Sequence, residues 1–237
     1  MFHEATPILF LDQLDSFSYN IIHQIQGLVG DHVRVEVVRY DDNQLWDNLS
    51  TAALKSYGGI VVGPGPGKPS DYPKISELLA RSLGELPVLG ICLGMQIMGE
   101  MLGYSVGEAP MAVHGKQRMM IHSGTRVFQG MESPMAIGRY HSLCVQIQGS
   151  PALDALPCIL KPTSNSLVGR TMKTKDNIAY CADFSDVQIE LIGVCEQLPM
   201  AMCVPGLKWD AVQFHPESVL TPKGDIVMRN WLQFLTD

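Results

Sequence analysis

The feature that most limits the fold of this chain is the alternation of short apolar runs with longer amphipathic stretches in its N-terminal part. Apolar runs of this length are typical of buried strands, and the stretches between them are long enough for helices. Such alternation predicts βαβ units on a parallel sheet, where ligand sites lie at the carboxyl ends of the strands. The expected strand and helix pairs are 8–11 with 16–28, 33–39 with 44–54, 60–62 with 72–83, and 88–91 with 95–102.

The rest of the chain has a different pattern. Residues 111–204 are rich in short strand-like runs, such as 189–194, and we expect them to form an antiparallel layer that flanks the parallel sheet. Residues 225–235 have helical periodicity and should pack as a closing helix. Because no repeat, linker or low-complexity segment interrupts the sequence, the prediction is one α/β domain over residues 1–237. Its mostly parallel sheet is flanked by helices and carries a small additional antiparallel layer.

The composition narrows the possible functions. The chain has 237 residues, 46% of them hydrophobic, which is enough for a sizeable core. Its formal net charge is −7 without clusters of Lys or Arg, which argues against nucleic-acid binding. No apolar run approaches the roughly 20 residues of a membrane helix, so no membrane association is expected. Residues 1–5 lack the positive charge and apolar core of a signal peptide, which favours a cytoplasmic location.

The cysteines and histidines give no metal-binding pattern. The six cysteines show neither Cys-x-x-Cys pairs nor ligand spacing, and the seven histidines are scattered. Reduced thiols are the simplest interpretation in a cytosolic chain. We therefore expect neither a metal site nor a bound cofactor.

Cys92 is the first candidate for catalysis. It lies in Gly90-Ile91-Cys92-Leu93-Gly94, where the apolar run 87–91 meets a helix-like stretch that begins near Met95. In a sharp strand-to-helix turn, small neighbours lift the central residue clear of the sheet and leave backbone N–H groups beside it. The helix N-terminus also favours an anion, and hence the reactive thiolate. A buried structural cysteine is the alternative, because free Cys behaves mainly as a small hydrophobe.

A second candidate segment, Gln213-Phe214-His215-Pro216-Glu217-Ser218, directly follows the strand-like run 209–212. His215 and Glu217 are two residues apart, so both point to the same side of an extended segment. A carboxylate beside an imidazole fixes its tautomer and stabilises the protonated ring. Taken alone, the segment is typical of a polar strand end with a solvated Glu. Taken with Cys92, it supplies a Cys–His–Glu triad.

A third segment, Val62-Gly63-Pro64-Gly65-Pro66-Gly67-Lys68-Pro69, must be compared with a phosphate-binding loop. The Walker pattern needs a Gly where Val62 stands and a Ser or Thr where Pro69 stands. Pro64 and Pro66 also lack the backbone donors that such a loop uses. A nucleotide site is therefore not expected. The Pro-Gly alternation is compatible with a stiff surface turn, but a rigid loop beside a strand end can also aim a glycine N–H at a developing oxyanion.

Five motifs together resemble a known family. They occur in the order and spacing of the triad-type, or class I, glutamine amidotransferases, and the resemblance runs from about Ile8 to Leu235, weakest between about Cys158 and Cys203. The motifs are Pro64-Gly65-Pro66-Gly67, Gly90-Ile91-Cys92-Leu93-Gly94-Met95-Gln96, His114-Gly115-Lys116, Arg139-Tyr140-His141-Ser142-Leu143 and Gln213-Phe214-His215-Pro216-Glu217-Ser218.

Within that family, two segments look like the small subunit of anthranilate synthase and of aminodeoxychorismate synthase. They are the Arg-Tyr-His-Ser-Leu motif and the opening Phe10-Leu11-Asp12-Gln13-Leu14-Asp15-Ser16-Phe17-Ser18-Tyr19-Asn20. This chain also departs from the family pattern at two places. Met95 stands where close relatives often have His, although other branches resemble this chain. Residues 161–186 look like an insertion of turns and a loop, which weakens the assignment of a partner if they lie at its interface.

The resemblance implies the flavodoxin-like class I amidotransferase fold and a reaction. Cys92 attacks the side-chain carboxamide of L-glutamine, and His215, oriented by Glu217, protonates the leaving ammonia and then activates water. It assigns the oxyanion donors to the backbone of Leu93 and Gly65. The remaining residues that it assigns to oxyanion or substrate binding are Pro66, Gly67, Gln96, Ser142 and Leu143, the last three at the amino acid end of glutamine. By the same resemblance, His114 and His141 are expected to be structural.

Ammonia made at such a site needs an acceptor, and nothing in this chain is suited to bind one. The resemblance implies a chorismate-utilising synthase subunit as the partner in a hetero-oligomer. Anthranilate synthase component II is favoured over aminodeoxychorismate synthase, although the residues that decide between them lie on the synthase. The alternatives are the glutaminase subunit of another ammonia-using synthase, a γ-glutamyl hydrolase, and an inactive regulator, which should lack at least one triad residue.

Overall fold

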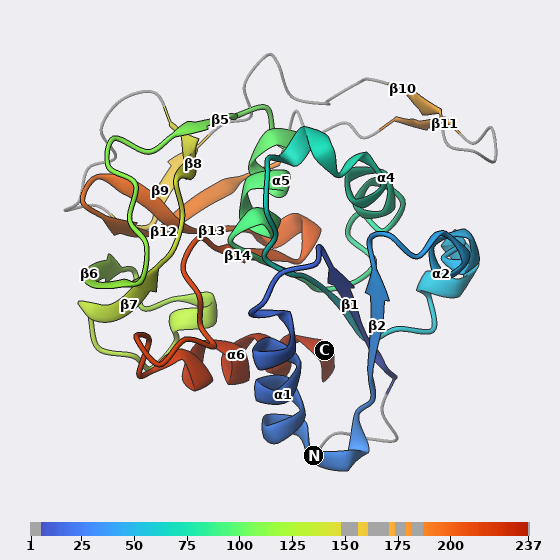
Figure 1. The fold of residues 1–237 in the computed structure, drawn as a ribbon, viewed down its shortest axis with the longest axis horizontal. Coiled ribbons are helices and arrows are strands. Elements are labelled where there is room, and N and C mark those ends of the chain that lie inside the picture. The colour runs from blue at the N-terminus through green and yellow to red at the C-terminus, as the bar shows by residue number, and fades with distance from the viewer. Residues whose placement is uncertain (1–5, 148–155, 161–170, 174–178, 182–186, 237) are drawn as a thin grey trace.

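A computed structural model of the chain describes residues 6–147, 156–160, 171–173, 179–181 and 187–236 (Figure 1). At its centre is a ten-stranded sheet in the order β2-β1-β3-β4-β14-β13-β12-β6-β7, with β9 paired to β12 off this path. The sheet is parallel from β2 to β14 and antiparallel beyond β14. Helices cover both of its faces.

The parallel half follows the alternation that the sequence predicts. Its strands are β1 (Ile8–Asp12), β2 (Val35–Arg39), β3 (Gly59–Val62), β4 (Val88–Ile91) and β14 (Trp209–Val212). The α-helices are α1 (Ser18–Val29), α2 (Asn43–Asn48), α3 (Thr51–Leu54), α4 (Pro73–Arg81), α5 (Leu93–Met101) and the closing α6 (Gly224–Gln233). The α/β fold class predicted from the sequence is therefore confirmed.

The antiparallel strands mostly continue the edge of the same sheet instead of covering one of its faces. They are β6 (Lys116–His122), β7 (Met135–Arg139), β9 (Cys158–Leu160), β12 (Ile189–Cys195) and β13 (Leu198–Val204). A separate small antiparallel sheet pairs β5 (Ser105–Glu108) with β8 (Leu143–Gln146). In the expected insertion, 161–186, β10 (Thr171–Lys173) pairs with β11 (Ala179–Cys181), and the rest of that segment lies outside the described residues. Short 3-10 helices are η1 (Gly30–His32), η2 (Pro69–Asp71), η3 (Arg126–Phe128), η4 (Pro205–Leu207) and η5 (Phe234–Thr236).

The helix expected over residues 44–54 is divided into two. The Asp42 side chain accepts from the Leu45 N–H at 3.1 Å and starts α2, and the Ser50 side chain accepts from the Ala53 N–H at 3.1 Å and starts α3. Ser50 itself has extended backbone angles, φ −68° and ψ 163°. A residue that caps a new helix cannot continue the previous one, so Ser50 ends the first helix while starting the second.

The core lies on both faces of the sheet. Alternate residues of β1 belong to different apolar clusters, Ile8 and Phe10 to the cluster under α1 and α6, and Leu9 and Leu11 to the cluster under α4 and α5. All four are fully buried, which is what a central parallel strand requires. Both faces of the sheet at β1 are therefore filled with apolar side chains.

Two glycines allow α5 to pack closely against the strands that precede it. A Cβ atom on Gly94 would lie 2.4 Å from the carbonyl oxygen of Val62, and one on Gly90 would lie 2.7 Å from the carbonyl carbon of Gly94. Side-chain Cβ atoms do not make backbone contacts this short. Gly90 and Gly94, two positions before and after Cys92, are therefore glycines because of packing between β3, β4 and α5.

We expect Gly94→Ala to lower the free energy of unfolding by about 1–3 kcal/mol, because the added methyl group forces α5 away from β3. Urea denaturation with a secondary-structure signal measures this. Gly27→Ala is the matched control, since Gly27 lies inside α1 with no atom within 4 Å of the added Cβ. The control should be stabilised by up to about 1 kcal/mol. Equal stability of the two variants would contradict the packing argument.

Candidate active site

Cys92 lies between β4 and α5, at the carboxyl end of the parallel strands. Its backbone angles, φ 54° and ψ −99°, fall in a region that residues with a side chain rarely adopt. The Cys92 N–H donates to the carbonyl oxygen of Val212 at 2.8 Å, which ties the turn to the end of β14. The strand-to-helix turn is thus held by the sheet at the residue that carries the thiol.

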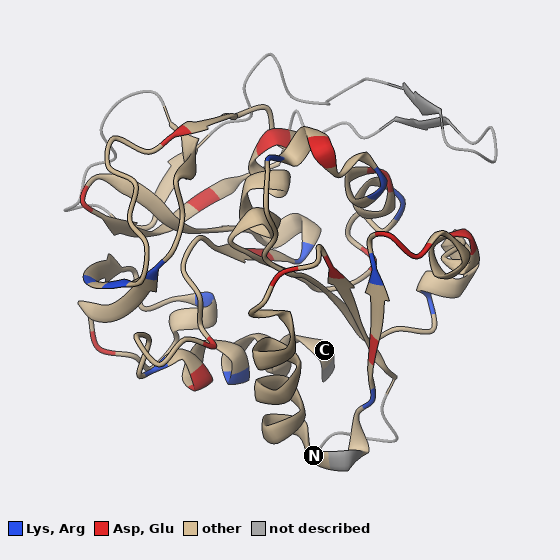
Figure 2. Cartoon of the chain, in the orientation of Figure 1, with Lys and Arg blue, Asp and Glu red and all other residues tan. Residues whose placement is uncertain are grey.

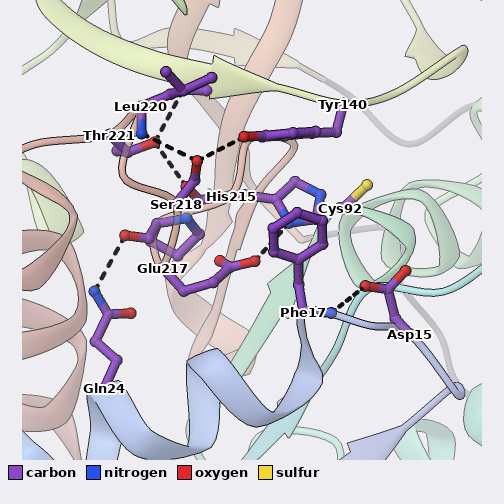
Figure 3. Close-up of polar contacts among 12 residues, drawn as sticks. Asp15, Phe17, Gln24, Cys92, Tyr140, His215, Glu217, Ser218, Leu220 and Thr221 are labelled. Atoms are coloured by element: carbon purple, nitrogen blue, oxygen red, sulfur yellow. Dashed lines mark hydrogen bonds and ion pairs between the residues drawn. The ribbon is translucent and has the colours of Figure 1, made fainter. Parts of the chain in front are cut away.

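His215 and Glu217 follow β14, the neighbour of β4 in the sheet, so they reach the same strand ends as Cys92. His215 Nδ1 lies 2.6 Å from Glu217 Oε1, and both side chains are almost wholly buried. Figure 3 shows this contact, with the Cys92 side chain beside the His215 ring. The structure therefore brings together the three residues that the sequence selects as a triad.

The environment of His215 favours its charged form. Burial alone would lower the pKa of the ring, because burial penalises charge. Hydrogen bonds to Cys92 and Glu217, together with the charges of these two groups, outweigh burial and raise the pKa of His215 to about 10. The ring is then protonated at neutral pH, with a carboxylate on one side and the sulfur on the other. Such an arrangement can hold a thiolate ready for nucleophilic attack.

Two aromatic side chains enclose the His215 ring. The ring centroids of Phe17 and Tyr140 are each 5.1 Å from the centroid of His215, and also 5.1 Å from one another. These walls limit rotation of the imidazole and keep water from its faces. Phe17 and Tyr140 occur in the family motifs, but the local sequence gives no sign that positions 17, 140 and 215 meet. Sequence reasoning therefore missed both.

The loop after His215 is fixed by hydrogen bonds to β7. Thr221 Oγ1 donates to the carbonyl oxygen of His215 at 2.7 Å and accepts from the Gly138 N–H at 2.9 Å. The Tyr140 hydroxyl lies 2.9 Å from Ser218 Oγ (Figure 3). A Cβ atom on Gly138 would lie 2.9 Å from Leu220 Cβ and 3.0 Å from Ser218 Oγ, so this loop packs closely on β7. These contacts position the imidazole relative to the sheet independently of its contact with the carboxylate.

The Pro-Gly loop lies against the start of α5. A Cβ atom on Gly65 would be 2.7 Å from Leu93 Cδ2, so the loop packs against the Leu93 side chain. In the part of the chain that the structure describes, neither the Gly65 N–H nor the Leu93 N–H donates a hydrogen bond. The Tyr72 hydroxyl donates to the carbonyl oxygen of Pro66 at 2.8 Å, while Pro66 and Gly67 themselves are exposed. Two unpaired amides beside Cys92 can stabilise a developing oxyanion.

Gln96 points into the protein, and only 3% of its surface is exposed. Its Nε2 donates to the carbonyl oxygen of Leu143 at 3.1 Å and to Gln213 Oε1 at 3.2 Å. The Leu143 carbonyl also accepts from His141 Nδ1 at 2.8 Å, whereas Ser142 is exposed. The nitrogen of Gln96 and the carbonyl of Leu143 are therefore already paired. The Ser142 carbonyl accepts from the Ala109 N–H at 2.8 Å, so Gln96 Oε1 and the Ser142 N–H are the groups of this set left for a ligand.

Lys, Arg, Asp and Glu are spread over the described elements (Figure 2). No helix in the described ranges is long and apolar enough to cross a membrane. Among the same residues, no group of three or more His, Cys, Asp or Glu is placed to hold a metal ion.

Comparison with known proteins agrees with this geometry. The family model described as glutamine amidotransferase class-I matches residues 9–181. Anthranilate synthase component 2 of Mycobacterium tuberculosis is 32% identical over 226 residues, which are 95% of this chain and 81% of that protein. The Bacillus subtilis protein named aminodeoxychorismate/anthranilate synthase component 2 is 29% identical over 226 residues, 95% of each chain. A solved glutamine amidotransferase of Thermotoga maritima superposes with a TM-score of 0.64 at 15% identity, over 99% of this chain and 97% of that one.

The chain therefore belongs to the class-I glutamine amidotransferase family, and it is an enzyme of that class. The relatives that match nearly its whole length are named as component 2 of anthranilate synthase, or of a combined aminodeoxychorismate/anthranilate synthase. The structural likeness, at 15% identity, shows the shared fold alone. The family predicted from the five motifs is thus confirmed.

We expect Glu217→Gln to destabilise the fold in a pH-dependent way. Because the pKa of His215 is raised on folding, its attraction to Glu217 is fully present below the unfolded pKa of about 6.5 and is lost as the pH rises through about 10. The loss in free energy of unfolding should be about 3 kcal/mol near pH 6 and clearly smaller above pH 10. Urea denaturation at the two pH values measures it.

Glu132→Gln is the control for this experiment. Glu132 is 93% exposed and its carboxylate lies 3.6 Å from Lys223 Nζ, so this ion pair contributes little at either pH. A loss for Glu217→Gln that stays constant between pH 6 and pH 10 would contradict a charged His215 in the folded protein.

Proposed function

We propose that Cys92, His215 and Glu217 hydrolyse L-glutamine through a thioester, and that the ammonia passes to a chorismate-utilising synthase subunit. The observation that carries the proposal is the buried thiol, imidazole and carboxylate at the ends of β4 and β14. The free amides of Gly65 and Leu93 beside the thiol complete what acyl transfer needs.

The first half of the reaction forms the thioester. The Cys92 thiolate attacks the carboxamide carbon of glutamine, and the oxygen of that group becomes an oxyanion that the N–H groups of Gly65 and Leu93 stabilise. When this intermediate collapses, the carbon–nitrogen bond breaks. The protonated His215 gives its proton to the leaving nitrogen, which departs as ammonia. The imidazole is then neutral and faces the thioester.

The second half regenerates the enzyme. His215 takes a proton from a water molecule, whose oxygen attacks the thioester carbon at the same oxyanion site. Collapse breaks the carbon–sulfur bond and restores the Cys92 thiolate beside a protonated ring. The new carboxyl group of glutamate releases its proton to solvent. Glu217 remains a carboxylate throughout and holds the ring by its Nδ1–H.

The amino acid end of glutamine is held, in this proposal, by Gln96, Ser142 and the backbone around Leu143, with Pro66 and Gly67 at the edge of the loop. Gln96 Oε1 is suited to accept from the α-ammonium group, because Gln96 Nε2 is already engaged. The Leu143 carbonyl already accepts two hydrogen bonds, which leaves it a positioning role. This refines the substrate contacts expected from the family motifs.

Exposed apolar side chains around the site support a protein partner. Leu14 and Tyr19 flank Phe17, and they are 47% and 58% exposed. Val219, 92% exposed, lies in the loop that follows His215, whose ring contacts Phe17. Large exposed apolar side chains close to a site are typical of an interaction surface. The names of the relatives favour a synthase that makes anthranilate over one that makes aminodeoxychorismate.

As part of the same proposal, the chain acts as one domain in the cytoplasm. The single ten-stranded sheet supports one domain, because it joins the first and the last strands of the chain. The described cysteines Cys92, Cys144, Cys158, Cys195 and Cys203 are free, which agrees with a reducing compartment.

We expect Cys92→Ser to abolish glutamine-dependent product formation by the complex with its synthase while ammonia-dependent formation is kept, because only the release of ammonia needs the thiolate. Cys144→Ser is the control, since Cys144 is also free and buried. It should keep both activities. Loss of both activities in the Cys92 variant would assign Cys92 a structural role.

Mass spectrometry after treatment with a diazoketone analogue of glutamine should find the adduct on Cys92 and on no other cysteine.

We also expect the isolated chain to hydrolyse glutamine slowly and to be stimulated by the synthase subunit. The Gly65 amide is aimed by an exposed loop, and loss of one oxyanion donor typically costs ~2.7–4 kcal/mol. Correct aiming in the complex should therefore raise kcat by about two to three orders of magnitude. Steady-state assays at saturating glutamine, with and without the partner, measure this effect. Equal kcat values would rule it out.

A further inference from the structure

Gln213 is a fully buried side chain that contacts the nucleophile. Its Nε2 lies 3.5 Å from Cys92 Sγ, within the range of an N–H to sulfur hydrogen bond. Its Oε1 accepts from Gln96 Nε2 at 3.2 Å. The position follows from the sheet, because Ile91 of β4 pairs with Val212 of β14. Cys92 and Gln213 are the next residues on the two strands.

A buried Arg fixes the tautomer of His141, whose ring donates to the same Leu143 carbonyl as Gln96 does. Arg139 is fully buried and can only donate, and its Nε donates to His141 Nε2 at 3.1 Å. Burial, followed by the charge of Arg139, lowers the pKa of His141 to about 4, so this ring is neutral. Since Nε2 accepts, Nδ1 must carry the proton of the neutral ring.

The order of donors and acceptors can be followed from His141 to Cys92. His141 Nδ1–H donates to the carbonyl oxygen of Leu143, which also accepts from Gln96 at 3.1 Å. A carbonyl can only accept, so Gln96 must present its NH2 group there. The second N–H of that group meets Gln213 Oε1. Gln213 is then left with its own NH2 group toward Cys92.

We propose that Gln213 stabilises the Cys92 thiolate by donating a hydrogen bond to it, and that Gln96, held by the Leu143 carbonyl, keeps the Gln213 amide in this orientation. A thiolate accepts hydrogen bonds far better than a thiol or a thioester does, so the contact favours the charged nucleophile. It also favours the sulfur as a leaving group when the thioester is hydrolysed. The inference rests on the proposed role of Cys92 and adds a second donor to the one supplied by His215.

The test measures the reactivity of Cys92 with iodoacetamide in the full-length chain. The rate of alkylation at Cys92 is followed by mass spectrometry from pH 5 to pH 10, for the wild type, Gln213→Met and Gln213→Glu. Among the described residues, His215 faces the sulfur, Glu217 lies on the other side of the His215 ring, and Arg139 and His141 lie beyond Gln96. None of these is altered in the two variants.

The Met variant keeps the size of the side chain and removes the donor. Its alkylation at pH 7 should be about ten- to a hundredfold slower, with the pH profile displaced to higher pH, because a hydrogen bond to a charged group is lost. The Glu variant should be slower still, since it places a carboxylate against the sulfur. In steady-state glutamine hydrolysis, kcat should fall in both variants with little change in KM. A purely structural role would change thermal stability without displacing the alkylation profile.

Gln96→Glu tests the orientation without altering Gln213. A carboxylate at position 96 can only accept, so Gln213 should turn its NH2 group toward it and leave Oε1 beside the sulfur. Alkylation should slow by about tenfold or more. Iodoacetamide lacks the amino acid end of glutamine, so a lost substrate contact cannot explain such a result. Gln117→Glu is the matched control, because Gln117 Nε2 donates to the carbonyl oxygen of Leu220 on the exposed surface. Its profile should equal that of the wild type.

An unchanged profile in folded Gln213→Met overturns the inference. If that variant does not fold, an unchanged profile in Gln96→Glu overturns it instead.

The experiments distinguish failure of the inference from failure of the proposed function. If Cys92→Ser removes glutamine hydrolysis but Gln213→Met reacts as the wild type, only the inference fails. If Cys92→Ser still hydrolyses glutamine, the proposed function fails and the inference fails with it.

Discussion

The pairing of β4 with β14 is the interaction on which the rest of the site depends. These two strands are far apart in sequence but adjacent in the sheet, with Ile91 opposite Val212. The hydrogen bond from the Cys92 N–H to Val212 continues that register by one residue, beyond the last strand pair. Because parallel strands end at the same edge, the thiol and the segment that carries His215 come together there. A shift in this register would separate Cys92 from His215.

Burial of the charged groups in this site strengthens their interactions but costs free energy of folding. Removing an ion from water costs several kcal/mol even after relaxation, and His215 and Glu217 are both nearly inaccessible to solvent. Their 2.6 Å contact offsets part of that cost, but among the described residues Glu217 Oε2 and Arg139 Nη2 have no hydrogen-bond partner. The arrangement is therefore better explained by chemistry than by stability. In the low dielectric between Phe17 and Tyr140, each remaining interaction with the imidazolium is stronger.

The sequence alone predicts the parts of this structure that local patterns encode. Strand and helix periodicity gives the parallel half, and the glycines around Cys92 give the turn. The division of residues 44–54 was missed because a Ser inside an amphipathic stretch does not show whether its side chain caps a new helix. The rings around His215 and the donors leading to Gln213 were missed for another reason. Both depend on contacts between distant segments, and the orientation of an amide is set by neighbours that no sequence spacing reveals.

The loop at Gly65 differs from the rest of the site in how it is held. Cys92 is tied to β14 and His215 to β7, whereas the loop is anchored at its outer end by the Tyr72 hydroxyl. Its inner side touches Gln13, whose Cβ lies 2.5 Å from the position of a Cβ on Gly65. Gln13 precedes the exposed Leu14, which has a left-handed backbone at φ 63°. A partner that packs on Leu14 therefore acts on the segment against which the Gly65 amide rests. This contact links the exposed Leu14 segment to the Gly65 loop, which is held separately from Cys92 and His215.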